Sequence, residues 1–105
     1  TKGDIVSSVY THGRWVVKPG KEHEFVDAWR ELADWAMTEV PGAMGATLLR
    51  DHEQSNVFIS FGPWHDLEAV EAFRSALGFR ERFERLRMLV ESIQLETLDR
   101  VASVS

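Results

Sequence analysis

Residues 43–62 read AMGATLLRDHEQSNVFISFG, two apolar runs on either side of a polar segment. The first run covers residues 43–50 and the second covers 56–62. Short runs rich in aliphatic, β-branched and aromatic residues are typical of strands, and a short polar connection lets two such strands pair antiparallel. The segment therefore predicts a β-hairpin with a loop of medium length.

Upstream of this hairpin, the pattern predicts a strand followed by a helix. Residues 9–17 (VYTHGRWVV) are β-branched and aromatic, and the internal Gly13 is compatible with a bulge. Residues 21–40 carry apolar side chains at helical spacing, and the following Pro41 cannot continue a helix. A strand over 9–17 and an amphipathic helix over 21–40 are expected.

Downstream, the same two kinds of element follow in the order helix, strand. Asp66 is a good N-cap for a helix over residues 67–77, and Gly78 is expected to break that helix before it resumes over 79–90. Residues 92–101 (SIQLETLDRV) alternate between apolar and polar side chains, which predicts the last strand.

The predicted order is β-α-β-β-α-β in one α+β domain spanning residues 1–105, a ferredoxin-like plan with a four-stranded antiparallel sheet. Helices in this plan cover one sheet face only. Both faces of the predicted strands nevertheless carry large apolar groups: Phe58 lies on one side of its strand, and Val57, Ile59 and Phe61 lie on the other. Because so large an apolar face needs a cover, a second copy of the chain is expected on it.

Composition excludes several classes of partner and site. The chain has 12 Lys and Arg against 17 Asp and Glu, a formal charge of -5, which disfavours nucleic acid as a partner. No cysteine is present, so no disulfide, thiolate or Cys-based metal site can form, and a cytoplasmic location is expected. No apolar stretch is long enough to span a membrane, and residues 1–8 do not resemble a signal peptide.

Recognisable cofactor motifs are also missing. The four histidines show no His-x-His or i, i+4 spacing, which argues against a metal site. The seven glycines are isolated, so no Rossmann fingerprint or phosphate loop is present, and no Gly-x-Ser-x-Gly elbow occurs.

Over residues 8–101, the chain resembles the antibiotic biosynthesis monooxygenase family of the dimeric α+β barrel superfamily. The resemblance is carried by the segments VVKPGK (16–21), PG (41–42), FGPW (61–64) and LEAVEAFR (67–74). It implies a homodimer with a ligand cavity between sheet and helices in each subunit. Some members oxidise aromatic polyketides to quinones with neither metal nor flavin, and others degrade haem. The positions of the haem-degrading signature hold Gly13, Phe73 and Phe83 here, so haem degradation is not expected.

Aromatic and cationic side chains are the candidates for binding a substrate. Trp64, Phe73 and Trp29 are expected to line the cavity, with core packing as the alternative for the tryptophans. Trp64 is expected at the mouth, where its indole N–H could bind the substrate. Arg74 belongs to an arginine-rich stretch, residues 74–87, that is either a solvated, salt-bridged helix face or contributes a guanidinium to the cavity.

The predicted activity is a cofactor-independent monooxygenation of a small aromatic molecule by dioxygen, without haem, flavin or metal. Such a reaction needs a base to ionise the substrate and a donor for the resulting oxyanion. His65 is the first candidate for the base and His12 the second, while Tyr10 is a candidate donor. A non-catalytic ligand-binding or regulatory barrel, and an isomerase or decarboxylase on the same scaffold, remain alternatives.

Overall fold

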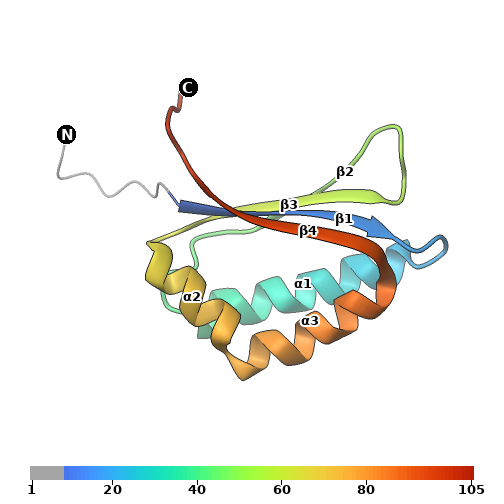
Figure 1. Cartoon of the computed structure of the whole chain (residues 1–105), viewed down its shortest axis with the longest axis horizontal. Helices are drawn as coiled ribbons and strands as arrows, with labels where there is room; N and C mark the ends of the chain where they lie inside the picture. Colours follow the sequence, from blue (N-terminus) through green and yellow to red (C-terminus); the bar gives the residue numbers. More distant parts are fainter. Residues whose placement is uncertain (1–8) are drawn as a thin grey trace.

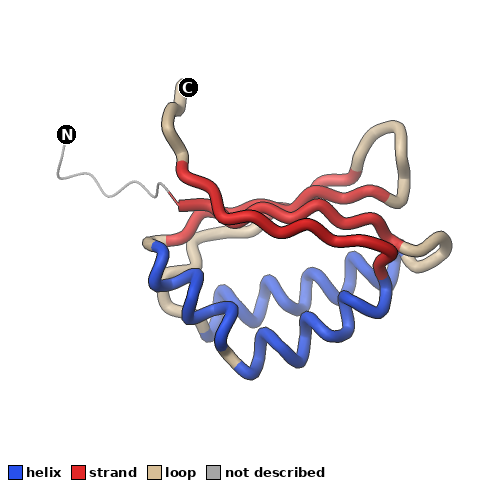
Figure 2. Tube along the Cα trace, in the orientation of Figure 1, coloured by secondary structure: helices blue, strands red, loops and turns tan. Residues whose placement is uncertain are grey.

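The computed structural model describes residues 9–105 and has two layers, a four-stranded sheet and three helices (Figure 1). All three helices lie on the same side of the sheet (Figure 2). The elements along the chain are β1 (Val9–Val17), α1 (Glu22–Glu39), β2 (Thr47–Arg50), β3 (Val57–Trp64), α2 (Leu67–Ser75), α3 (Leu77–Leu89) and β4 (Val90–Asp99). The ferredoxin-like α+β fold predicted from the sequence is confirmed.

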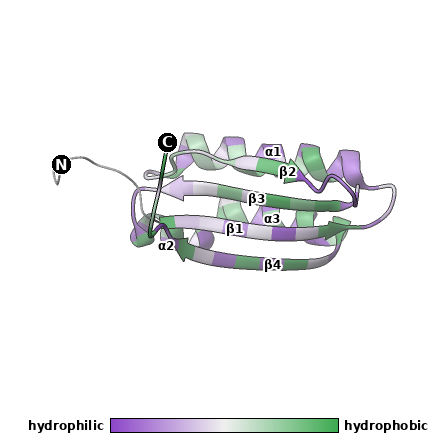
Figure 3. Ribbon diagram, turned by 90° about the horizontal axis from the view of Figure 1, so that it is seen from above, coloured by the Kyte–Doolittle hydropathy of each residue, from purple (hydrophilic) through white to green (hydrophobic). Residues whose placement is uncertain are grey.

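The sheet is antiparallel throughout and has the strand order β2-β3-β1-β4. The first strand therefore lies in the centre, paired with β3 on one side and with the last strand on the other. Trp15 lies opposite Phe58 of β3 and Ile93 of β4, which puts these three residues on one face because side chains alternate along a strand. Figure 3 looks onto the opposite face, with the helices behind.

The core forms between the inner sheet face and helix α1. Phe25 of α1 is fully buried, and its ring lies 5.3 Å from that of Trp15 and 5.1 Å from that of Phe58. Leu86 of α3 and Val17 of β1 are equally inaccessible to solvent and belong to the same cluster. The apolar side chains that recur at helical spacing over residues 21–40 therefore form one face of α1, and this face packs against the sheet as predicted.

The break between the two C-terminal helices was placed wrongly by the sequence. It lies at Ala76, whose backbone is extended (φ -72, ψ 142), and not at Gly78, which lies within α3. The reason is tertiary: a Cβ at position 78 would overlap the ring of Trp35 from α1. Gly78 therefore allows α1 and α3 to approach closely instead of ending a helix.

Other boundaries differ by a few residues. Strand β2 begins only at Thr47, because the chain before it crosses the inner sheet face, where the carbonyl of Gly45 packs against Gly62. Strand β3 continues to Trp64, and β4 covers Val90–Asp99 rather than 92–101. The predicted N-cap is confirmed, since the Asp66 carboxylate accepts the Ala69 N–H at 2.9 Å.

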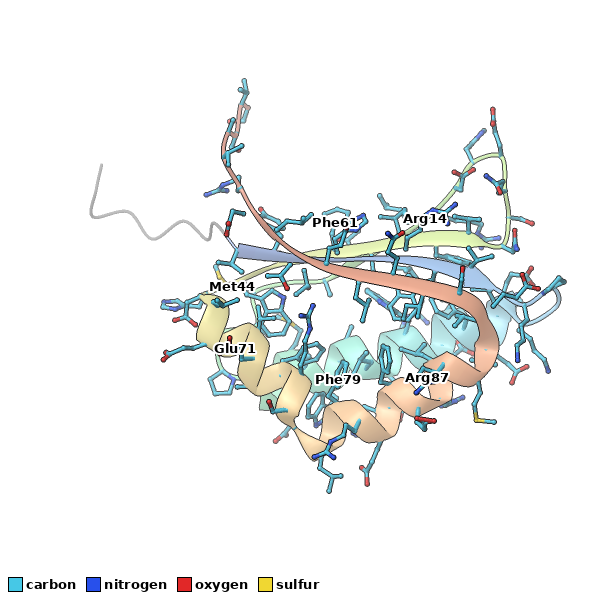
Figure 4. All side chains as sticks on the ribbon, viewed as in Figure 1. Arg14, Met44, Phe61, Glu71, Phe79 and Arg87 are labelled. Carbon is cyan, nitrogen blue, oxygen red and sulfur yellow. The ribbon has the colours of Figure 1, made fainter. Side chains whose placement is uncertain are left out.

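The outer sheet face has no cover among the described residues. Phe61 and Arg14 project from it, away from the helices (Figure 4). Phe61 is 37% exposed and Leu49, which lies on the same face, is 50% exposed. Phe58, by contrast, packs under the helices, and Val57 is already buried within the chain, so Ile59 and Phe61 are the residues of β3 that a covering partner would contact.

Two further points concern the ends of the chain and membranes. Residues 1–8, for which the sequence predicts no signal peptide, lie outside the described residues. From residue 9 onward, no helix has both the length and the apolar character that crossing a bilayer requires.

Candidate functional site

A cavity lies between the inner sheet face and the three helices, where the sequence predicted one. Its free volume is about 90 Å³, below the ~300–1,000 Å³ of sites that enclose a drug-sized ligand. Met37 and Leu95 line it and are 48% and 41% exposed, so two flexible side chains form part of its rim. The other lining residues are Thr11, His12, Trp15, Trp29, Leu32, Ala33, Ala36, Ala43, Gly45, Ala46, Ser60, Phe61, Gly62, Trp64, Phe73, Arg74, Phe79 and Phe83.

A continuous series of aromatic rings forms one wall of this cavity. The ring of Trp64 lies 4.8 Å from that of Phe73, which lies 4.7 Å from that of Phe79. Phe83 stacks on Phe79 at 5.0 Å and is 6.1 Å from Trp15. Phe79 projects into the space between the helices and the sheet (Figure 4). Such a wall favours a flat, apolar ligand over a sugar or a phosphate.

Hydroxyl groups of the sheet provide the polar part of the lining. The indole N–H of Trp15 donates to Ser60 Oγ at 2.9 Å, and that of Trp64 donates to Thr11 Oγ1 at 2.9 Å. A hydroxyl group that accepts a hydrogen bond still has its own proton to donate. Ser60 and Thr11 therefore each keep a proton that they can donate beside the aromatic wall.

Arg74 is the cationic group of the cavity lining. It lies in the last turn of α2, is half-buried, and donates from Nη1 to Thr97 Oγ1 of β4 at 3.1 Å. Thr97 is the direct cross-strand neighbour of Thr11, so the two hydroxyls are adjacent on the inner face. The Arg74 guanidinium therefore lies at one end of the row of hydroxyls that Thr97 and Thr11 form on the inner sheet face.

Four of the residues proposed from the sequence are brought together here: Trp64, Phe73, Trp29 and Arg74 all line the cavity. Trp64 is buried to 5% exposure rather than placed at the mouth. Its indole N–H already binds Thr11, so the expectation that it donates to a substrate is wrong for this arrangement. Trp64 instead contributes its ring to the lining of the cavity, and its N–H holds the hydroxyl of Thr11.

The side chains of the other three proposed residues do not point into the cavity. Tyr10 pairs with Pro63 and Leu98 in the adjacent strands, on the outer sheet face. His12 borders the cavity, but its side chain follows the alternation to the same outer face, where Nδ1 lies 3.2 Å from Glu96 Oε1. His65 follows the end of β3, and its exposed ring contacts Asp66 at 3.1 Å.

Perturbed carboxyl groups lie outside the cavity. The backbone N–H of Ala69, and next the side chain of His65, lower the pKa of Asp66 below its usual value. The backbone N–H groups of Gln54 and Glu53 lower the pKa of Asp51 in the hairpin loop. Both shifts come from a carboxylate that closes a turn, so they indicate local structure rather than catalysis.

Sequence reasoning missed the hydroxyls of Ser60, Thr11 and Thr97, as well as Phe79 and Phe83 as wall residues. Serine and threonine are common on strands and carry no motif of their own. The available signal was alternation, which puts Thr11 and Thr97 on the same face as the buried Trp15.

Comparison with known proteins agrees with this architecture. The family model of the antibiotic biosynthesis monooxygenases matches residues 8–85. The chain belongs to this family. A search of curated proteins finds no match for this family member.

Solved structures with the same fold come from distant organisms. SnoaB, a cofactor-independent oxygenase from Streptomyces nogalater, is 22% identical with a TM-score of 0.85, covering 94% of this chain and 98% of its own. A conserved protein from Methanosarcina mazei is 15% identical with a TM-score of 0.82, covering 95% and 99%. A Pseudomonas aeruginosa protein is 19% identical with a TM-score of 0.78, covering 95% and 100%. At these identities, the similarity establishes the fold alone.

Proposed function

We propose that this family member is a cofactor-independent monooxygenase that oxidises a planar aromatic molecule in the cavity between sheet and helices. The observation that carries the proposal is the wall of aromatic rings beside two hydroxyls, Ser60 and Thr11, that indole N–H groups orient. Family membership supports oxygenase chemistry, and SnoaB is described as an oxygenase of this kind.

The proposed reaction converts an anthrone-type methylene group to a ketone. The substrate loses a proton to give an enolate, which transfers one electron to dioxygen. The two radicals combine to a peroxide anion, which takes a proton from water and becomes a hydroperoxide. Loss of water from the hydroperoxide gives the quinone. One oxygen atom stays in the product and the other leaves in water, so no external reductant is needed.

The hydroxyls of Ser60 and Thr11 stabilise the enolate oxygen in this proposal. Each accepts an indole N–H and lines the cavity, so each keeps its own proton to donate to a bound substrate. Donors fixed in a water-poor site stabilise a developing negative charge more strongly than water does, because they need no reorganisation. The aromatic wall excludes water and stacks on the flat substrate.

The substrate proton needs an acceptor other than a side chain inside the cavity. Neither His65 nor His12 points its ring into the space, and within residues 9–105 no carboxylate lines it. We therefore propose that the proton leaves to water at the open rim. The movable side chains of Met37 and Leu95 at that rim give room for a ligand larger than the 90 Å³ of free volume.

The test is oxidation of anthrone under air, followed by quinone absorbance and oxygen uptake. The proposal expects one molecule of oxygen consumed per quinone and a rate well above that of heat-denatured protein. Ser60→Ala should lower kcat by about 10²-fold, the effect of losing one oxyanion donor. Ser55→Ala, in the exposed hairpin loop, is the matched control and should leave kcat unchanged.

Two results would contradict the oxygenase, and a third would contradict the role of Ser60. Binding without turnover would favour a ligand-binding barrel, and turnover without oxygen uptake would favour an isomerase or decarboxylase. An equal kcat for Ser60→Ala and the wild type would remove the role of the hydroxyl.

We also propose that the chain forms a homodimer through its outer sheet face. Exposed Leu49 and Phe61 lie on that face, and no described element covers them. Replacing Phe61 by Glu would place an unpaired charge in the apolar interface and should give a monomer. Leu77→Glu is the control, because Leu77 is 65% exposed on α3 in the other layer. Sedimentation of the wild type as a 12 kDa monomer would refute the dimer.

A further inference from the structure

Charged groups around the cavity are distributed unevenly. Among the described residues that line it, there is no aspartate, glutamate or lysine, and the guanidinium of Arg74 carries a positive charge. The chain as a whole has a formal charge of -5. The cavity is therefore lined by a positive charge although the chain as a whole is negatively charged.

Some arginines of the same helical region pair with a carboxylate, whereas Arg74, Arg80 and Arg82 form no ion pair among the described residues. Arg85 reaches Glu31 of α1 at 2.9 Å, and Arg87 lies 3.7 Å from Glu84. Within residues 9–105, Arg74 forms no such ion pair and instead donates to the neutral hydroxyl of Thr97. Of the three arginines without an ion pair, Arg74 is the one that lines the cavity, so its charge is available to an anionic ligand there.

The geometry also provides a second donor for that anion. Thr97 Oγ1 accepts from Arg74, which leaves the threonine proton free, and Arg74 retains further N–H donors. Thr97 lies directly opposite Thr11, whose hydroxyl is oriented by Trp64. The anion site and the proposed oxyanion donors are thus neighbours on one sheet face, beneath the same aromatic wall.

We propose that Arg74 and Thr97 form an anion-binding site that selects aromatic acids, so that the natural ligand is a planar aromatic ring system bearing a carboxylate. This inference rests on the proposed function and specifies its substrate class. The rings lie against the wall of Trp64 and Phe73, and the carboxylate binds Arg74 at the end of the cavity. Arg74 is a specificity-determining residue in this arrangement and does not touch the carbon that is oxidised.

The experiment compares the binding of 2-naphthoate and 2-naphthamide, which differ in charge but hardly in shape. Isothermal titration calorimetry under nitrogen separates binding from turnover. A charge-assisted hydrogen bond stabilises by enough to make naphthoate bind roughly ten- to hundredfold more tightly than the amide. Arg74→Gln should abolish this preference, and Thr97→Val should reduce it.

Arg80→Gln is the matched control, because it removes the same charge from an exposed position in the neighbouring helix α3. It should retain the preference for naphthoate. Circular dichroism checks that each variant is folded, and the amide serves as an internal reference, since Arg74→Gln should bind it as the wild type does.

The outcomes separate this inference from the oxygenase proposal. Equal affinity of the wild type for both ligands, or a preference that survives in Arg74→Gln, would overturn the anion site alone. Preference for naphthoate without oxygen uptake on an anthrone that carries a carboxylate would support the anion site and overturn the oxygenase. Failure of both ligands to bind would overturn the anion site, while oxygen uptake on an anthrone would still decide the oxygenase.

Discussion

The close packing around Gly13 gives a sharp test of the cavity geometry. A Cβ at this position would lie 2.8 Å from Ser60 Oγ and 2.8 Å from Trp15 Nε1, the two atoms of the hydrogen bond that orients the serine. Trp15 cannot move away, because its ring packs against Phe25 and is almost fully buried. In Gly13→Ala, the Ser60 hydroxyl must therefore rotate, and the bond is lost.

Two opposing effects decide the magnitude. Leaving the buried indole N–H of Trp15 without an acceptor costs about 1–3 kcal/mol. Replacing glycine by alanine in a strand recovers about 0.5–1 kcal/mol of backbone entropy. The loss exceeds the gain, and the remaining close contact of the new Cβ with Trp15 Nε1 adds to it, so Gly13→Ala should lower the free energy of unfolding by at least about 1 kcal/mol. For a domain of this size, that corresponds to a Tm about 4–8 °C lower.

Urea unfolding at a fixed protein concentration measures this difference, and a double-mutant cycle with Ser60→Ala identifies its cause. In the Ser60→Ala background the hydrogen bond is already absent, so the same change at Gly13 should cost less than in the wild type. A Gly13→Ala variant as stable as the wild type would refute the reasoning. An equal cost in both backgrounds would show that the hydroxyl is not involved.

Three other substitutions test the fold around the site. Gly78→Ala should destabilise the protein even though alanine is the better helix former by about 1 kcal/mol, because the new Cβ meets Trp35; thermal unfolding would show a lower Tm. Phe25→Ala should cost about 3–5 kcal/mol in urea unfolding, since Phe25 is fully buried. The pKa of Asp66 is lowered in the folded state, so its ionised form stabilises the protein at neutral pH and this contribution disappears as the pH falls through the lowered pKa. Asp66→Asn should consequently be less stable than the wild type at pH 7 and equally stable at about pH 2; a constant difference would contradict the assignment.

Local patterns were sufficient for most of the fold. The hairpin of residues 43–62, the apolar stripe around Phe25 and the N-cap at Asp66 each depend on neighbours in the sequence, and each is present. Gly78 misled the prediction because glycine has two different uses. It destabilises a helix, but here it also leaves room for Trp35, a residue 43 positions earlier that the local sequence cannot indicate.

The candidate site was predictable only in its apolar part. Large rings at helical and strand spacing indicate an aromatic cavity, and Trp64 and Phe73 indeed form part of its wall. Hydrogen bonds between strands depend on register, which single residues do not reveal. The same limit explains why Trp64 was expected to offer its N–H to a ligand, when Thr11 in the neighbouring strand already accepts it.

The central position of β1 has a consequence for the order in which the chain folds. This strand is made first, yet one of its two partners is the last strand, with Val9 paired to Asp99. Helix α1 and the hairpin can form while the chain is still being synthesised, but the sheet is complete only after β4 has left the ribosome. Pairings this distant in sequence are slow to form because a long loop must close first. The apolar residues of β1 are therefore exposed to aggregation until β4 has been synthesised and pairs with them.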